Sequence, residues 1–217
     1  MTADHPTTES LNPRSAALDT MSALEIVTLM NEEDSRVPAA IEPALPTIAA
    51  FVGATAERLR AGGRLFYVGA GTSGRLAVLD AIECVPTFSV SPELITPIMA
   101  GGEPALTRSV EGAEDDVELA RTDLAAAGLS SGDALAGIAA SGTTPYVIAA
   151  IEAAREVGAV TAGIANNAGT PVLDAADHAI AAVTGPEILS GSTRLKAGTA
   201  QKLILNMIST CLLYTSP

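Results

Sequence analysis

Two apolar segments of this 217-residue chain each run into a turn rich in glycine and hydroxyl side chains, a pattern that can bind an anion. Residues 65–68 are followed by Gly69-Ala70-Gly71-Thr72-Ser73-Gly74, and residues 134–139 by Ala140-Ser141-Gly142-Thr143-Thr144. In each turn, backbone N–H groups and the positive end of a helix would point at the ligand. If the two strands are neighbours, Ser73 and Ser141 can hold one phosphate from both sides.

The first turn also matches G-x-G-x-x-G, the pattern of dinucleotide-binding folds. That interpretation needs an acidic residue about 20 residues further on, at the end of the next strand. The next apolar segment, residues 94–99, is followed by Ala100-Gly101-Gly102, and Glu103 comes only after them. A single phosphate therefore fits better than a nucleotide. A turn that only caps a helix and binds nothing remains the simpler alternative.

Carboxylates near these turns supply the other half of a possible reaction site. Glu83 closes the helix predicted over residues 72–82, where the helix dipole disfavours negative charge. An acidic run, Glu111 to Asp116, begins the next predicted helix, where acids are favoured for structural reasons alone. Two carboxylates that meet at a phosphate-anchored sugar would provide a general acid and a general base. Arg194 and Lys196, in the loop before the last helix, would complete an anion site or remain exposed charges.

Composition restricts the class of protein. Hydrophobic residues make up 48% and charged residues 17%, enough for a buried core, while aromatic residues are only 3%. The formal net charge of −13 argues against nucleic acids and anionic membranes as partners. Cys84 and Cys211 are too few for a disulfide framework and have no metal-ligand neighbours. We expect a cytoplasmic protein, because residues 1–10 lack an apolar signal core and no uninterrupted apolar run reaches membrane length.

Strands and helices are predicted to alternate after residue 60, which indicates an α/β fold with a doubly wound, five-stranded parallel sheet flanked by helices. Ligands of such sheets bind at the carboxyl ends of the strands. The predicted strands are residues 64–68, 94–99, 134–139, 160–165 and 178–183. The predicted helices are residues 72–82, 114–127 and 144–157, a weak turn at 171–176 and a last long helix from about 195.

An N-terminal helical extension is predicted before the sheet. Ser22, with Glu25 three residues later, is typical of a capping box at a helix start. A second helix is expected over residues 37–60, with Pro38, Pro43 and Pro46 disturbing its first part.

Four long motifs carry a family resemblance. They are Tyr67-Val68-Gly69-Ala70-Gly71-Thr72-Ser73-Gly74-Arg75, Glu83-Cys84-Val85-Pro86-Thr87-Phe88, Val110-Glu111-Gly112-Ala113-Glu114-Asp115 and the run from Gly191 to Lys202. In this order, over residues 8–210, they resemble the N-acetylmuramic acid 6-phosphate etherase family. The resemblance implies a flavodoxin-like sugar isomerase (SIS) domain over residues 61–210, after an arm and helices over residues 1–60. Residues 211–217 do not resemble the family, so we expect its C-terminal helical domain to be absent.

The resemblance implies a carbon–oxygen lyase of amino sugar metabolism and cell-wall recycling. It would convert N-acetylmuramate 6-phosphate into N-acetylglucosamine 6-phosphate and D-lactate by elimination and hydration, without a cofactor or a metal. By analogy, Glu83 protonates the departing lactyl oxygen and Glu114 removes the C2 proton, although the sequence leaves open which carboxylate is the acid. A homodimer with sites completed by the partner subunit is also implied. The implied substrate contacts are Gly71, Thr72, Ser73, Glu111, Ser141, Gly142, Thr143, Thr144 and Glu187.

Two departures and two rival functions accompany this resemblance. Thr143 stands where the family usually has Arg, which removes a cation from the rim of the phosphate site. Val85 stands where Pro is common. A sugar-phosphate-binding regulatory module, like the glucokinase regulatory protein, and an aldose–ketose isomerase remain alternatives. Lactate release separates the lyase from both.

Overall fold

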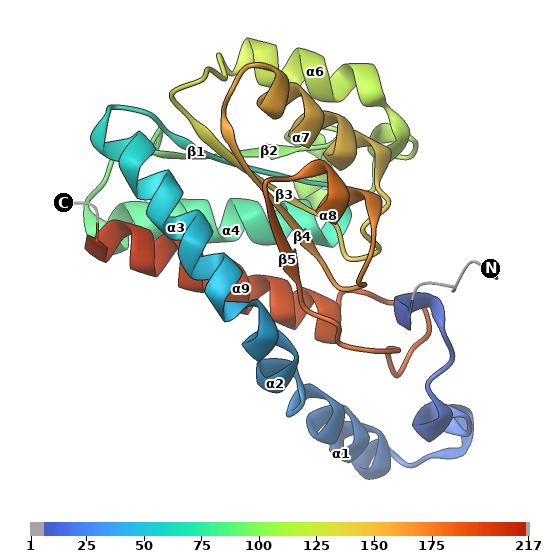
Figure 1. Cartoon of the computed structure of the whole chain (residues 1–217). Helices are drawn as coiled ribbons and strands as arrows, with labels where there is room; N and C mark the ends of the chain where they lie inside the picture. The colour runs from blue at the N-terminus through green and yellow to red at the C-terminus, as the bar shows by residue number, and fades with distance from the viewer. Residues whose placement is uncertain (1–6, 216–217) are drawn as a thin grey trace.

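The computed structural model describes residues 7–215, and in this part of the chain five parallel strands form one sheet between two layers of helices (Figure 1). The strand order is β2-β1-β3-β4-β5. The strands are β1 (Leu65–Gly69), β2 (Ile95–Met99), β3 (Ala134–Ile138), β4 (Val160–Ala165) and β5 (His178–Ala181). The predicted fold class is therefore confirmed, and the predicted strand ends lie within two residues of those in the structure.

The order of the strands places the two predicted anion turns side by side. β1 pairs with β3 in parallel, and the register sets Gly69 opposite Ile138. Because the chain leaves both strands at the same edge, the turn after β1 and the turn after β3 are neighbours. This is the switch point of the sheet, where β1 lies between β2 and β3 and ligands of such folds bind.

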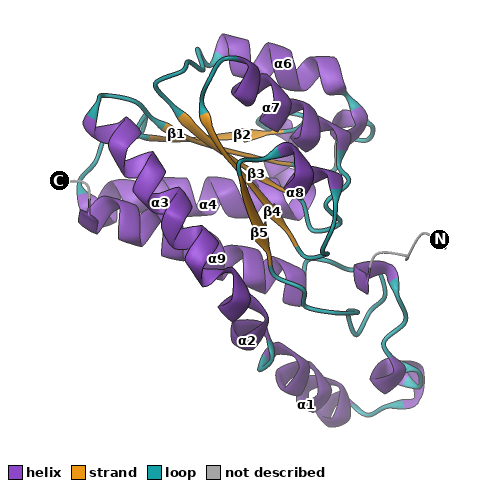
Figure 2. Ribbon diagram, viewed as in Figure 1, coloured by secondary structure: helices purple, strands orange, loops and turns teal. Residues whose placement is uncertain are grey.

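Helices cover both faces of the sheet (Figure 2). Side chains alternate along β1, so Tyr67 joins one buried cluster and Phe66 the other. The Tyr67 face is covered by α3 (Leu45–Arg60), α4 (Gly71–Phe88) and α9 (Lys196–Thr215). The Phe66 face is covered by α6 (Val117–Ala126), α7 (Pro145–Glu156) and α8 (Pro171–Ala175).

Two of the helices predicted after residue 60 differ from those in the structure by more than two residues at one end. α4 continues through Pro86 to Phe88, so Glu83 lies inside this helix and the prediction that it closes the helix is wrong. The predicted helix over residues 114–127 begins only at Val117, because the Asp116 side chain accepts the Leu119 N–H and caps it there. Glu114 instead belongs to a short 3-10 turn, η5 (Ala113–Asp115), after the short helix α5 (Pro104–Thr107).

The N-terminal extension consists of an arm and three helices. The arm has three 3-10 turns, η1 (Thr7–Glu9), η2 (Pro13–Ser15) and η3 (Leu18–Thr20). α1 (Ala23–Asp34) begins with the predicted capping box of Ser22 and Glu25 and extends away from the sheet (Figure 1). The predicted helix over residues 37–60 is divided into α2 (Val37–Ile41), the 3-10 turn η4 (Glu42–Ala44) and α3. Residues 1–6 of the predicted arm lie outside the described residues.

By length and composition alone, one stretch of the described chain, Ala23–Arg60, is able to cross a membrane. The expectation concerned uninterrupted apolar runs and is not contradicted, because acidic and basic residues interrupt this stretch. The core helix of a soluble protein passes the same test, and 33% of the most apolar window is buried inside the protein. α3, at the end of this stretch, packs against α9 and β5.

The last helix runs without a break into the segment expected to be anomalous. α9 continues through Cys211 to Thr215, and Leu212 is buried in the core on the Tyr67 face. Residues 216 and 217 of the expected tail lie outside the described residues.

Candidate functional site

Two hollows lie at the carboxyl edge of the sheet. The first has a volume of about 260 Å³ and is bounded by the turn after β1 and the segment between β2 and α6. Of the predicted site residues, it brings together Gly71, Glu111 and Glu114. The second, of about 590 Å³, is bounded by the turn after β3, the end of β4 and the N-terminal arm, and Ser141 and Thr143 line it.

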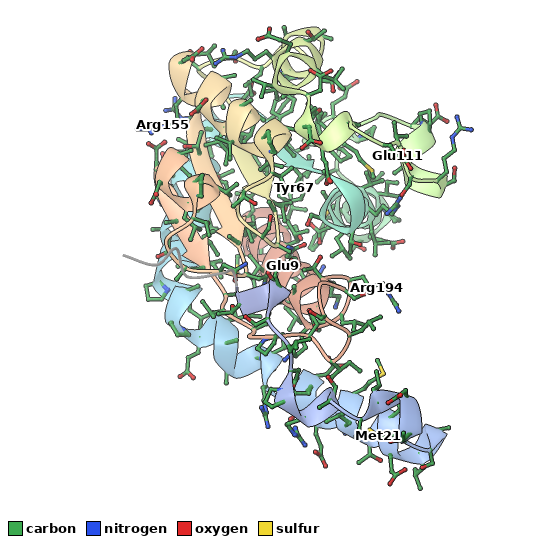
Figure 3. All side chains as sticks on the ribbon, turned by 90° about the vertical axis from the view of Figure 1, so that its right-hand side faces the viewer. Glu9, Met21, Tyr67, Glu111, Arg155 and Arg194 are labelled. Atoms are coloured by element: carbon green, nitrogen blue, oxygen red, sulfur yellow. The ribbon has the colours of Figure 1, made fainter. Side chains whose placement is uncertain are left out.

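In the first hollow, α4 supplies one wall and an irregular segment supplies the other. Gly71 begins α4 with φ of +54°, a conformation that favours glycine, after Ala70 as the N-cap residue. Arg75, one turn later, donates hydrogen bonds to the carbonyl oxygens of Ala105 at 2.8 Å and Leu106 at 3.2 Å. Glu111 and Glu114 are both exposed on the opposite wall. Figure 3 shows Glu111 on a loop at the side of the molecule.

The Ser73 hydroxyl is held by a buried chain of amides. It donates a hydrogen bond of 2.8 Å to Gln201 Oε1 on α9. Gln201 Nε2 then donates to Asn166 Oδ1 at 3.0 Å, and Asn166 Nδ2 donates to the Ala182 carbonyl at 3.0 Å. This chain ties the turn after β1 to α9 and to the ends of β4 and β5. Ser73 is only 7% exposed and lines neither of the two hollows.

In the second hollow, the turn after β3 is fixed from inside and from the arm. Ser141 Oγ accepts hydrogen bonds from the Thr143 backbone N–H at 3.2 Å and the Thr143 hydroxyl at 3.1 Å. Asn167 Nδ2 donates to the Ser141 carbonyl at 3.3 Å, and Asn167 Oδ1 accepts from the Thr7 hydroxyl at 2.9 Å. The arm thus forms one wall of this hollow, and Figure 3 shows its Glu9 near the middle of the view.

The remaining turn residues have different positions. Gly142 is buried with φ of +76°, and Thr144 is the N-cap residue of α7 without a side-chain capping bond. Pro145 occupies the first helical position of α7. Thr72 is half-buried and lines neither of the two hollows.

Glu83 stands apart from the other predicted catalytic residue. It is exposed on α4 and lines neither hollow. At 1.5 Å per helical residue it lies about 18 Å along the helix axis from Gly71. Because it is inside α4, the argument from the helix dipole does not apply to it. A single chain therefore holds Glu114 at the hollow and Glu83 well away from it.

The loop before α9 is tied into the protein rather than open to a ligand. Glu187 is fully buried and accepts the backbone N–H groups of Lys196 at 3.0 Å and Ala197 at 2.9 Å, which caps α9. Burial raises the pKa of the Glu187 carboxyl, and these backbone hydrogen bonds oppose the rise. The Lys196 ammonium is 2.6 Å from Glu33 Oε2 in a buried ion pair. Lys196 therefore fits neither alternative from the sequence, an anion site or an exposed charge, and Glu187 caps α9.

Several residues of this edge were missed by reasoning from the sequence. Asn166 and Asn167 follow β4 directly, and the same rule that selected the other two strand ends would have found them. Gln201 lies within the fourth family motif, but it is far from the turns in sequence, and nothing in the motif links it to Ser73. Arg108 lines the first hollow with Glu111 and Glu114, yet it stands in a segment with no recognisable motif. Within residues 7–215, no group of three His, Cys, Asp or Glu side chains is placed to hold a metal ion.

Known proteins are similar to nearly the whole chain. Residues 47–155 match the model of the glucokinase regulatory protein N-terminal SIS domain, and residues 113–210 match the SIS domain model. N-acetylmuramic acid 6-phosphate etherase from Streptomyces avermitilis is 55% identical over 94% of this chain and 66% of its own length. N-acetylmuramic acid 6-phosphate etherase 2 from Lactiplantibacillus plantarum is 53% identical over 97% of this chain and 71% of its own length. The chain thus spans about two thirds of the length of these curated relatives.

Solved structures agree with the fold. A putative phosphosugar isomerase involved in capsule formation, from Bacteroides fragilis, superposes with a TM-score of 0.68. The match covers 90% of this chain and 92% of that one at 17% sequence identity. Identity this low supports the common architecture and nothing finer.

Proposed function

The chain belongs to the N-acetylmuramic acid 6-phosphate etherase family, and we propose from this that it acts as a lyase on N-acetylmuramate 6-phosphate. The products would be N-acetylglucosamine 6-phosphate and D-lactate. The observation that carries the proposal is the first hollow, which Glu111 and Glu114 line together with Gly71 of the predicted anion turn. A general base and a phosphate cradle at one strand edge are what an elimination on a sugar phosphate requires.

The substrate would be anchored through its phosphate. The turns after β1 and β3 are neighbours, and both offer backbone N–H groups at a helix start together with hydroxyl side chains. Ser73 and Ser141 supply the hydroxyls, as the sequence predicts. Thr143 lines the second hollow, and none of the residues that line this hollow carries a positive charge. The phosphate would therefore be held there by hydrogen bonds rather than by an ion pair.

The chemical step would be an elimination followed by hydration. In the ring-opened sugar the C2–H is acidic, because it lies beside the aldehyde, and the Glu114 carboxylate removes this proton. The electron pair forms the C2–C3 double bond while the C3–O bond to the lactyl group breaks. Glu83 protonates the departing oxygen, and water then adds at C3 and returns a proton to C2. Proton transfers of this kind contribute roughly 10²–10⁴-fold each.

The position of Glu83 makes a homodimer part of the proposal. One chain holds Glu83 about 18 Å along α4 from the anion turn, so the acid for one site would come from the partner subunit. A symmetric pair would build two such composite sites.

The proposed substrate is an amino sugar phosphate. We therefore also propose a cytoplasmic location and a role in cell-wall recycling.

The test is D-lactate release from N-acetylmuramate 6-phosphate, measured with this chain and with a Streptomyces avermitilis relative of full length. Release by this chain supports the proposal and shows that residues 1–217 hold a working site. Release by the relative alone would contradict the proposal for this chain. Each assay needs a Glu114→Gln control to exclude contaminating activity.

A sugar-phosphate-binding module without turnover is the second candidate. The match of residues 47–155 to the glucokinase regulatory protein N-terminal SIS domain favours it. Calorimetric binding of N-acetylglucosamine 6-phosphate without lactate release would support this candidate. Interconversion of an aldose and a ketose phosphate would instead support the isomerase that the sequence left open.

A further inference from the structure

Arg108 is an unpaired cation at the mouth of the first hollow. The hollow has two arginines in its wall, Arg75 and Arg108, and two carboxylates, Glu111 and Glu114. Arg108 is exposed, and within the described part of the chain its guanidinium forms no hydrogen bond or ion pair. In a protein with a formal net charge of −13, such a cation is a local site for a negatively charged group.

Arg75 sets the position of Arg108. Its guanidinium donates to three successive parts of the neighbouring backbone: the carbonyl of Ala105 at 2.8 Å, of Leu106 at 3.2 Å and of Arg108 itself at 3.4 Å. These bonds join the start of α4, where the anion turn lies, to the segment that carries Arg108. Arg75 therefore has its donors directed to backbone oxygens, while those of Arg108 remain available to a ligand.

We infer that the Arg108 guanidinium binds the carboxylate of the lactyl group in the substrate, and that Arg75 is the positioning residue for it. The inference rests on the proposed function, whose substrate carries two anionic groups, a phosphate and this carboxylate. Hydroxyls and backbone N–H groups at the strand-end turns suit the phosphate. A planar guanidinium with parallel N–H donors suits a carboxylate.

The same contact makes Arg108 a specificity residue. N-acetylglucosamine 6-phosphate has the phosphate and the sugar of the substrate but lacks the lactyl carboxylate. A cation that binds the carboxylate distinguishes these two molecules, whereas a cation that binds the phosphate does not. Arg108 lines the same hollow as Glu111 and Glu114, so its positive charge offsets the repulsion between these two side chains and the carboxylate of the substrate.

The experiment compares the wild-type chain with Arg108→Ala, Arg108→Lys and a control, Arg121→Ala. Arg121 is a partly exposed arginine on α6 whose ion pair with Glu156 lies outside both hollows. Calorimetry gives the Kd of N-acetylglucosamine 6-phosphate, and the lactate assay gives KM and kcat for N-acetylmuramate 6-phosphate. Where a protein shows no turnover, calorimetry with N-acetylmuramate 6-phosphate replaces the assay. Thermal unfolding of each variant confirms that it is folded.

For Arg108→Ala we expect KM for N-acetylmuramate 6-phosphate to rise at least tenfold, with the Kd of N-acetylglucosamine 6-phosphate within twofold of wild type. Arg108→Lys should recover part of the loss, and Arg121→Ala should match wild type. Equal weakening toward both ligands would overturn the inference, because Arg108 would then bind the phosphate. Unchanged binding of both would overturn it as well. Failure of the proposed function is a separate result, in which the wild-type chain would release no lactate. The calorimetric comparison of the two sugar phosphates would still test Arg108 in that case.

Discussion

The Ser73 hydroxyl at the start of α4 donates a 2.8 Å hydrogen bond to the Gln201 side chain on α9, which is 128 residues away in sequence. Gln201 in turn donates to Asn166 at the end of β4. Three separate elements therefore fix the hydroxyl that the proposed function uses for phosphate. The geometry of the anion turn depends on a helix that lies far from it in the chain.

Replacement of Gln201 tests this dependence. Gln201→Met keeps most of the side-chain volume but leaves the Ser73 hydroxyl and Asn166 Oδ1 without their partners in a buried place. A buried polar group without a partner costs about 1–3 kcal/mol, so with two such groups the free energy of unfolding should fall by roughly 2–6 kcal/mol. Urea unfolding measures this loss. Binding of N-acetylglucosamine 6-phosphate should weaken in parallel, because Ser73 is no longer held.

Thr199 provides the control for Gln201. It is an exposed residue of the same helix, and its hydroxyl bonds only to the Leu195 carbonyl one turn earlier. Thr199→Ala should change the free energy of unfolding by less than about 0.5 kcal/mol. If Gln201→Met were equally mild, the hydrogen-bonded chain would have no energetic importance.

Gly142 tests the fit of the turn after β3. Its φ is +76°, and a Cβ added there would lie 2.2 Å from Thr170 Oγ1 and 2.5 Å from Thr170 Cβ. Because the Thr170 Cβ is attached to its backbone, rotation of the side chain does not relieve the clash. Gly142→Ala should therefore reduce the free energy of unfolding by about 3 kcal/mol or more, from positive φ and overpacking together. Thermal unfolding and phosphate binding report the change.

The matched control for Gly142 is a glycine with similar backbone and no neighbour. Gly169 has φ of +62°, and nothing lies within 4 Å of a Cβ placed on it. Gly169→Ala should lower the free energy of unfolding only by the cost of a positive φ in a residue with a Cβ, about 1–2 kcal/mol. Equal losses at the two positions would show that the contact with Thr170 relaxes freely.

Glu33 makes a pH-dependent contribution to stability. It is 2% exposed and faces Lys196, Arg14 and Arg36. Burial raises the pKa of Glu33, but the hydrogen bonds from Lys196 and Arg14 outweigh burial and hold the folded pKa below its ordinary value. A carboxyl whose pKa is lower in the folded state stabilises the protein above its unfolded pKa. This contribution is lost as the pH falls through the folded value.

Glu33→Gln should therefore be most harmful at neutral pH. It leaves Lys196 buried without its counter-charge, and removal of one partner of a buried pair costs about 3–5 kcal/mol. The difference from wild type should shrink as the pH falls through the lowered folded pKa of Glu33, below which the wild-type carboxyl is itself protonated. Urea unfolding between pH 3 and 7 measures it. Glu32→Gln, at an exposed neighbour, is the control; a pH-independent Glu33 effect would contradict the assignment.

The fold was predictable because its signals are local. Each strand is a short apolar run next to a turn, and the alternation with helices allows few topologies. Helix ends were harder, since they depend on single contacts. α6 starts at Val117 rather than at residue 114 because the Asp116 carboxylate accepts the Leu119 N–H. α4 passes Pro86 and ends with Ser89 in a left-handed conformation, which no sequence rule anticipated.

The candidate site was predictable only in part, for a related reason. Gly71, Ser73, Ser141 and Thr143 follow strands directly, so the rule for parallel sheets places them at one edge. The capping of α9 by Glu187 and the ion pair of Lys196 with Glu33 are tertiary contacts that no local pattern predicts. Arg108 was missed because its position depends on hydrogen bonds from Arg75. Arg75 belongs to another element and lies about one turn into α4.

The two carboxylates of the proposed mechanism give the last prediction. Glu114 lines the first hollow, whereas Glu83 is exposed about 18 Å along α4 from Gly71. If a site takes Glu114 from one subunit and Glu83 from the partner, Glu83→Gln and Glu114→Gln should each abolish lactate release while they retain binding of N-acetylglucosamine 6-phosphate. Unchanged release by either variant would remove that residue from the mechanism.

Mixing the two inactive variants distinguishes a shared site from a site within one chain. After unfolding and refolding of an equal mixture, half of the dimers carry one variant of each kind, and one of their two sites has both carboxylates intact. Lactate release should then return to about a quarter of the wild-type rate, as expected for a symmetric dimer. Refolding each variant alone is the control and should give none. If both carboxylates acted within one chain, every site in the mixture would lack one of them and no activity would return.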